Sequence, residues 1–343
     1  MLPVCRPRLL TCKTRHFYPL CTAQKTSYVG QRVPLASEYH ENDFEWEEHA
    51  LIAAPLVREQ EEKAAVLRNK GLDVHKVAPG MSPDIQQVQL PAFSPEMNTA
   101  TGQRCEGGHW EAFYQQHTEA RFYKLRRYIL LEFPALSQLS EEDHVMEIGC
   151  GCGSSILPVL AANRSVTATV TDVSTTSTEQ LVHAACCMGI LPPDVLVPGA
   201  ATPKIKSFIC DSSDPEAAPH FNDIHASHLL IMFTLSAIPP PKQLEMLKNA
   251  FRALRPGGKL LLRDHGLYDM VQLRIPAEQW LAPNLYRRGD STLAYFFSLE
   301  DFKERAEAAG FTVEECKYVC VINKNKKTGI ELKRVFMHAV CRK

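Results

Sequence analysis

A glycine-rich loop is the part of this sequence with the clearest chemical meaning. It runs from Glu147 to Ser154 and reads Glu-Ile-Gly-Cys-Gly-Cys-Gly-Ser, after an apolar run that predicts a strand and before a predicted helix. Glycines such as Gly149 and Gly151 allow a sharp turn and a close approach of the backbone to a ligand. Proteins that bind NAD, FAD or S-adenosylmethionine all use such loops, so the loop alone predicts an adenine-containing ligand and does not choose among them.

Two aspartates stand at the ends of the next two predicted strands. Asp172 follows the loop by about 20 residues, where a carboxylate can accept hydrogen bonds from both ribose hydroxyls, and Asp211 would lie near the adenine amino group. Either residue alone could equally be a helix cap or a turn residue. Together with the loop they predict one ligand crevice, because the carboxyl ends of neighbouring parallel strands meet at one edge of a sheet.

A dense polar cluster, Arg263 to Met270, follows the fifth predicted strand. Burying two carboxylates, an arginine and a histidine so close together is costly without partners, which favours substrate binding or catalysis over a salt-bridged loop. We predict Asp264, Asp269 and Arg263 as catalytic residues. Further along the chain, Arg287-Arg288-Gly289-Asp290 and Tyr295-Phe296-Phe297 add charges and rings that suit phosphates and stacked bases, although the phenylalanines could equally be core residues.

The elements that must position these residues alternate between strands and helices. Such alternation predicts an α/β fold with a mostly parallel sheet and helices on both faces. A turn over Arg255 to Gly258 should lead into the fifth strand, and a turn over Asn323 to Gly329 should join the last two strands as an antiparallel hairpin. This hairpin favours a methyltransferase over a dehydrogenase, which commonly needs a second nucleotide-binding unit. The predicted strands are 144–148, 167–171, 205–210, 225–233, 259–263, 312–321 and 332–341, and the main helices are 241–254 and 299–309.

Three regions are predicted along the chain. Residues 1–37 form a basic leader with no Asp or Glu, the composition of a transit peptide, although a disordered basic tail would look the same. Residues 38–135 form an N-terminal extension, with a charged helix around 57–70, a Pro-rich arm over 77–101 and an amphipathic helix from Trp110. Residues 136–343 form the ligand-binding domain.

Composition excludes several classes of protein. The formal net charge of -1 gives no general affinity for nucleic acid, so any RNA contact must come from local basic patches. The 12 cysteines are scattered without a paired zinc spacing, so we predict reduced thiols and no metal site. We also predict no membrane span, because no apolar run approaches the necessary ~18 residues.

The motifs together resemble the eukaryotic tRNA N3-methylcytidine methyltransferases. The resemblance runs from about Tyr28 to Arg342. Its most specific blocks are Arg-Asp-His-Gly-Leu-Tyr-Asp over 263–269 and Tyr-Phe-Phe over 295–297. It implies a class I, Rossmann-like methyltransferase with a seven-stranded sheet. It also implies S-adenosylmethionine as cofactor and methyl transfer to N3 of a cytidine in the tRNA anticodon loop, at position 32.

The resemblance also implies roles for individual residues. An aligned acceptor such as Asp264 or Asp269 would bind the exocyclic amine and stabilise the cationic methylated base. Trp110 and Tyr114 would form a lid over the cofactor rather than the core-facing side of an amphipathic helix. The implied cofactor contacts are Trp110, Tyr114, Gly149, Gly151, Asp172, Asp211 and Met232, and the candidate phosphate contacts are Lys124, Arg126, Arg127, Arg287 and Arg288.

Four departures from the family pattern bear on the substrate. The family's Phe-Phe-Lys-Asp-Arg-His stands here as Phe-Tyr-Lys-Leu-Arg-Arg over 122–127, and His265 replaces a tyrosine. Ser291 and Leu293 interrupt a Gly-Asp-Gly-Thr-Arg motif, and Ser212 replaces a leucine. The preferred tRNAs and any helper protein, such as an aminoacyl-tRNA synthetase or a tRNA-binding adaptor, therefore stay open.

The leader favours mitochondria over the cytosol as the location. Two other functions stay open at this point: a methyltransferase for a protein or small molecule, and a non-catalytic RNA-binding subunit with the same fold.

Overall fold

The structure is a computed structural model that describes residues 39–69, 108–117, 124–192, 204–324 and 329–343. The predicted leader and the Pro-rich arm lie outside these ranges. Within them, no helix is both long and apolar enough to cross a membrane.

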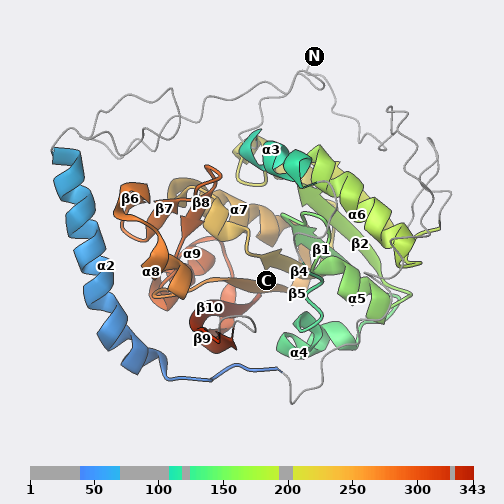
Figure 1. Ribbon diagram of the computed structural model, residues 1–343. Helices are drawn as coiled ribbons and strands as arrows, with labels where there is room; N and C mark the ends of the chain where they lie inside the picture. The colour runs from blue at the N-terminus through green and yellow to red at the C-terminus, as the bar shows by residue number, and fades with distance from the viewer. Residues whose placement is uncertain (1–38, 70–107, 118–123, 193–203, 325–328) are drawn as a thin grey trace.

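A sheet of seven strands forms the centre of the molecule (Figure 1), and its order is β3-β2-β1-β4-β5-β10-β9. The strands β1 to β5 pair in parallel, whereas β10 is antiparallel to both β5 and β9. The predicted mixed sheet with a terminal hairpin is therefore confirmed. The strand bounds are β1 His144–Ile148, β2 Thr167–Asp172, β3 Ile205–Ile209, β4 Ala226–Met232, β5 Leu254–His265, β9 Thr312–Lys324 and β10 Glu331–Arg342.

One predicted turn has a different form. The residues from Arg255 to Gly258 belong to β5 itself. Ala226 pairs with Leu254 and His228 pairs with Lys259, so the four residues between bulge out of the ladder. Gly257 has a φ of 75°, which glycine adopts without strain.

Alternating side chains divide the core into two layers. Met146 and Ile231 face one side of the sheet and pack with residues of α7 and α9. Val145 and Leu230 face the other side and pack with α4, α5 and α6. The helices cover both faces because successive strand residues point to opposite sides. The bounds are α4 Ile129–Glu132, α5 Ile156–Ala162, α6 Thr175–Cys187, α7 Pro240–Ala253 and α9 Leu299–Ala308.

A second, smaller sheet was missed in the sequence. Its strands are β6 Trp280–Ala282, β7 Leu285–Arg287 and β8 Leu293–Tyr295, in that antiparallel order. Strands of three residues are too short to show an alternating pattern. The ring block 295–297 belongs to this region and is buried, with Phe296 and Phe297 fully enclosed. The core interpretation of these two rings is therefore the correct one.

The helix α2, Trp46–Asn69, lies along this smaller sheet and the short helix α8, Met270–Arg274 (Figure 1). It begins earlier than predicted, because Trp46 stacks between Tyr268 and Tyr318 at centroid distances of 5.7 and 4.6 Å. Gln60 donates to the carbonyl of Ile275, and Tyr286 donates to Gln60. The N-terminal extension is thus joined to the C-terminal part of the domain.

A buried ion cluster ties α4 to the terminal hairpin. Glu132 accepts hydrogen bonds from Arg263 and from Nδ1 of His338, and the Arg263 guanidinium lies 4.2 Å from the centre of the Phe336 ring. The Arg263 and Glu132 side chains are 5% and 1% exposed. Burial alone would lower the pKa of Arg263, but the Glu132 charge raises it above its ordinary value. Removing either partner would therefore leave a buried charge without compensation.

Replacing Glu132 by Ala should destabilise the protein by roughly 3–5 kcal/mol, because it leaves the Arg263 charge buried without its partner. Chemical denaturation measures the change in the free energy of unfolding. Glu142→Ala, at an exposed position nearby, is the matched control and should change it by less than about 0.5 kcal/mol. Similar small effects of both substitutions would contradict this role.

Candidate functional site

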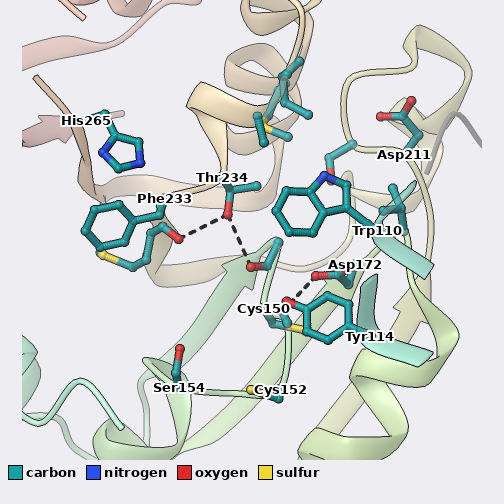
Figure 2. Close-up of a pocket in the computed structure, with 18 of the residues that line it drawn as sticks. Trp110, Tyr114, Cys150, Cys152, Ser154, Asp172, Asp211, Phe233, Thr234 and His265 are labelled. Atoms are coloured by element: carbon teal, nitrogen blue, oxygen red, sulfur yellow. Dashed lines mark hydrogen bonds between the residues drawn. The ribbon is translucent and has the colours of Figure 1, made fainter. Parts of the chain in front are cut away.

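The glycine loop after β1 is held against the ends of two other strands. The amides of Gly149 and Cys150 both donate to the carbonyl of Thr171, at 2.8 and 3.1 Å. Thr234, just beyond β4, donates to the Gly149 carbonyl (Figure 2). A Cβ atom on Gly149 would lie 2.2 Å from the Thr234 side chain, and its φ of +70° is strained for other residues. Only glycine fits this contact.

The carboxylate of Asp172 fixes the rest of the loop. One oxygen accepts the Gly151 amide at 2.8 Å and the other accepts the Ser174 amide at 3.0 Å. The residue is 8% exposed. Burial raises the pKa of this carboxyl, while these two amides oppose the rise. Each oxygen keeps further lone pairs for a ligand.

Asp211 follows β3 and lies across the same cleft. One of its oxygens accepts both the amide and the hydroxyl of Ser213, at 2.9 and 2.6 Å. Among the contacts described, the other oxygen of Asp211 accepts no hydrogen bond, so it is available to a ligand. Apolar atoms line the cleft around it, from Cys210, Val173, Ile238 and Met246. The cleft has a volume of about 370 Å³.

The helix α3, Gly108–Gln116, covers this end of the cleft. Trp110 and Tyr114 line the cleft near Asp172 (Figure 2). The Tyr114 hydroxyl lies so close to the loop that a Cβ atom on Gly151 would meet it at 2.4 Å. The two aromatic side chains and the glycine loop therefore line the same end of the cleft.

Glu111 anchors α3 to the first turn of α6. Its carboxylate accepts hydrogen bonds from the Ser174 hydroxyl at 2.7 Å and from both the hydroxyl and the amide of Thr176. Burial alone would raise the pKa of Glu111, but these hydrogen bonds hold it below its ordinary value. Sequence reasoning missed this residue, because an acidic residue early in a helix is common on electrostatic grounds alone.

The opposite end of the cleft is cationic and aromatic. It is lined by Arg126, Arg288 and Arg334, with the rings of Phe233, His265 and Phe336 among them. Figure 2 shows His265 and Phe233 at one end, Asp172, Asp211, Trp110 and Tyr114 at the other, and Thr234 between them. Phe233 has a φ of 58°, which is unusual for a bulky residue, and strain of this kind often marks a functional site.

Comparison with known proteins assigns the fold to a family. A model described as a methyltransferase domain matches residues 117–316. The tRNA N(3)-methylcytidine methyltransferase Mettl2 of Drosophila melanogaster is 31% identical over 242 residues, which cover 68% of this chain and 70% of that protein. Human tRNA N(3)-cytidine methyltransferase METTL6 is 30% identical and is covered to 78%, with 67% of this chain aligned.

The chain belongs to the tRNA N3-cytidine methyltransferases. A crystal structure of a SAM-dependent methyltransferase from Anabaena variabilis covers 68% of this chain and 93% of its own, with a TM-score of 0.50 and 15% identity, a likeness in fold alone. The predicted class I methyltransferase fold is thereby confirmed.

The structure brings every residue that was predicted to contact the cofactor to this one cleft. They are Trp110, Tyr114, Gly149, Gly151, Asp172, Asp211 and Met232. Within the described ranges, no group of three or more His, Cys, Asp or Glu side chains could hold a metal ion.

The predicted catalytic residues lie elsewhere. None of Asp264, Asp269 and Arg263 lines the cleft. Asp264 is fully buried and accepts the amides of Ser236 and His265, at 3.0 and 2.8 Å. It therefore shapes the loops that end β4 and β5. It does not present an acceptor to a ligand.

Asp269 and Arg263 have positioning contacts too. Asp269 caps α8 through the Val271 amide and accepts hydrogen bonds from Arg334 and from the Val335 amide. Arg263 belongs to the ion cluster with Glu132. The cluster 263–270 has its partners inside the protein: Arg263 and Asp269 form ion pairs, and Asp264 accepts backbone amides.

The predicted RNA contacts divide into two groups. Arg126 and Arg288 line the cleft, and Arg126 donates to the hydroxyls of Ser154 and Ser155. Lys124 is exposed, whereas Arg127 and Arg287 are partly buried outside the lining. Sequence reasoning also missed Phe233 and Arg334 as lining residues. Arg334 is brought in by the hairpin; it belongs to a block of the family resemblance, Lys333-Arg334-Val335-Phe336, but was given no role, and Phe233 belongs to no motif that its spacing could reveal.

Replacing Asp172 by Asn should weaken binding of S-adenosylmethionine at least tenfold. The amide nitrogen cannot accept a hydrogen bond, so one backbone amide of the loop and one ligand hydroxyl lose their acceptor. Titration calorimetry measures the affinity. Asp223→Asn, at an exposed position outside the cleft, is the isosteric control, and equal affinities for the two variants would refute the assignment.

Replacing Glu111 by Ala should weaken cofactor affinity by roughly tenfold, because α3 loses its charged anchor on α6. The same calorimetric titration tests this. Gln115→Ala removes only a contact within α3 to Glu111 and should leave the affinity nearly unchanged. If the lid is irrelevant to cofactor binding, both variants will bind like the parent protein.

Proposed function

We propose that this protein transfers a methyl group from S-adenosylmethionine to N3 of a cytidine in the anticodon loop of tRNA, at position 32. The observation that carries the proposal is a cleft with two unlike ends. One end combines Asp172 and Asp211 with apolar walls, and the other combines arginines with rings. The relatives that share this domain are named as tRNA N3-cytidine methyltransferases.

The first end fits an adenosyl ligand. Gly149 and Gly151 line the cleft and carry no side chain, so a ligand can approach the backbone of the loop there. Asp172 would accept the ribose hydroxyls, and Asp211 with the apolar slot beside it would hold the adenine. Trp110 and Tyr114 would cover the ligand and exclude water. When bound, S-adenosylmethionine supplies an electrophilic methyl group on a sulfonium.

The second end needs no general base. Cytosine N3 carries a lone pair at neutral pH, so it requires positioning and not deprotonation. In agreement with this, Asp172 and Asp211 are the only carboxylates among the described residues that line the cleft, and both lie at the other end. Phe233 lines this end and is partly exposed, so its ring can take part in stacking with a base. The ring of Phe336 is buried, with the guanidinium groups of Arg263 and Arg334 4.2 and 4.8 Å from its centre.

A base in a folded loop must leave its stack to reach such a cleft, at a cost of a few kcal/mol. Phosphate contacts would offset this cost. Arg126, Arg288 and Arg334 line the cleft. Lys124 is exposed and stands two residues before Arg126 in the sequence. We propose these four residues as the RNA-contacting cations. Arg127 and Arg287 stay predictions, as do a helper protein and a mitochondrial location.

Two other functions compete less well. A methyltransferase for a protein or small molecule would share the adenosyl end but would not need an arginine-lined cationic end. A non-catalytic RNA-binding subunit would have no reason to keep the Asp172 contacts to the loop and to α6. Both alternatives also fit poorly with the chain's family.

The decisive experiment incubates the purified full-length protein with labelled S-adenosylmethionine and total tRNA, followed by nucleoside analysis of the product. We expect 3-methylcytidine, and loss of the label when the cytidine at position 32 of a synthetic anticodon stem-loop is replaced by uridine. Formation of 5-methylcytidine would overturn the choice of atom. Label on added protein alone would support the first competing function, and the absence of cofactor binding would support the second.

A further inference from the structure

An unpartnered ring nitrogen stands at the cationic end of the cleft. The imidazole of His265 lines the cleft and lies near the Phe233 ring, with their centroids 5.5 Å apart (Figure 2). The residue is 7% exposed. Its Nδ1 is buried and has no hydrogen-bond partner in the part of the chain that the structure describes. Buried polar atoms are normally paired, so an unpaired one in a residue that lines a cleft is a candidate contact for a ligand.

The contact on the other ring nitrogen fixes the tautomer. Nη2 of Arg288 lies 2.9 Å from Nε2 of His265. A guanidinium has only donors and does not lose its proton in proteins. Nε2 must therefore accept, and the ring proton of the neutral imidazole must be on Nδ1. The unpartnered atom is a hydrogen-bond donor.

The surroundings keep this imidazole neutral. Burial, together with the positive charges of Arg288, Arg334 and Arg126, holds the pKa of His265 well below its ordinary value. The neighbouring carboxylates do not oppose this: Asp264 accepts backbone amides, and Asp269 is paired with Arg334. At physiological pH the ring thus offers one acceptor, which Arg288 uses, and one donor, which is unused.

We propose that His265 is a substrate-binding residue whose Nδ1–H donates a hydrogen bond to an oxygen of the target cytidine. The proposal rests on the proposed function, because a flipped nucleotide is the ligand that this end of the cleft would receive. The exocyclic amine of cytosine is itself a donor and cannot serve. The acceptors that remain on the nucleoside include the carbonyl O2 of the base and the ribose 2′-oxygen.

Two substitutions separate the two ring nitrogens. An asparagine amide can place a donor near the position of Nδ1 but has no atom at the position of Nε2. A glutamine amide can reach Arg288 as an acceptor near the position of Nε2 but has no donor at Nδ1. If the ring only anchors Arg288, His265→Gln is the milder change. If Nδ1–H binds the substrate, His265→Asn is the milder change.

The experiment measures kcat/KM for methylation of an anticodon stem-loop RNA by the full-length protein. We expect His265→Gln to lower kcat/KM about tenfold, mainly through KM, and His265→Asn to stay within about threefold of the parent. Unchanged affinity for S-adenosylmethionine shows that both variants are folded. The reverse order, or equal losses, would overturn the proposal.

Modified RNAs identify the acceptor. A 2-thiocytidine at the target position replaces O2 by sulfur, a weak acceptor, and a 2′-deoxycytidine removes the ribose oxygen. One modification should lower kcat/KM of the parent protein without lowering kcat/KM of His265→Gln any further. That modification identifies the oxygen that contacts Nδ1–H. If both modifications affect the two proteins equally, no such contact exists. Failure of the parent protein to methylate the unmodified RNA would refute the proposed function itself, separately from the role of His265.

Discussion

The carboxylate of Asp172 is the point on which the cleft depends. It accepts one amide from the glycine loop and one from the residue that precedes α6. That residue, Ser174, also caps α6 and donates its hydroxyl to Glu111 on α3. A single acid therefore links the floor of the cleft to the anchor of its lid. Because the carboxylate is buried, these hydrogen bonds are stronger than they would be in water, and losing one of them leaves an unpaired group in the interior.

The adenosyl end could be predicted from the sequence because most of its residues are placed by the strands that directly precede them. The glycine loop and the two aspartates stand at or just after the ends of parallel strands of predictable length, and parallel strands bring their ends to one edge. Gly149, Asp172 and Asp211 needed no knowledge of the tertiary structure beyond the sheet. The lid required the family resemblance, because the spacing of Trp110 and Tyr114 fits an amphipathic core helix equally well.

The other end could not be predicted in the same way. The polar cluster 263–270 is dense in charges, but whether a charge faces a ligand or a partner depends on residues far away in sequence. Glu132, which pairs with Arg263, is 131 residues distant, and Arg334, which pairs with Asp269, is 65 residues distant. The partners arrive only when α4 and the hairpin close on β5. The positive φ of Phe233 likewise could not be predicted, because nothing about a phenylalanine in the sequence indicates a strained backbone.

The charges of this end raise a physical question, since a cytosine methylated at N3 carries a positive charge and three arginines surround the site. The arginines suit a polyanion, which brings its own phosphates and neutralises them on binding. A free nucleoside brings no phosphate to offset these charges beside the cationic product. The low pKa of His265 acts in the same direction, because a protonated ring would add a fourth charge there. The site is therefore complementary to a cytidine within an RNA strand rather than to the base alone, which is the selectivity that an RNA-modifying enzyme needs.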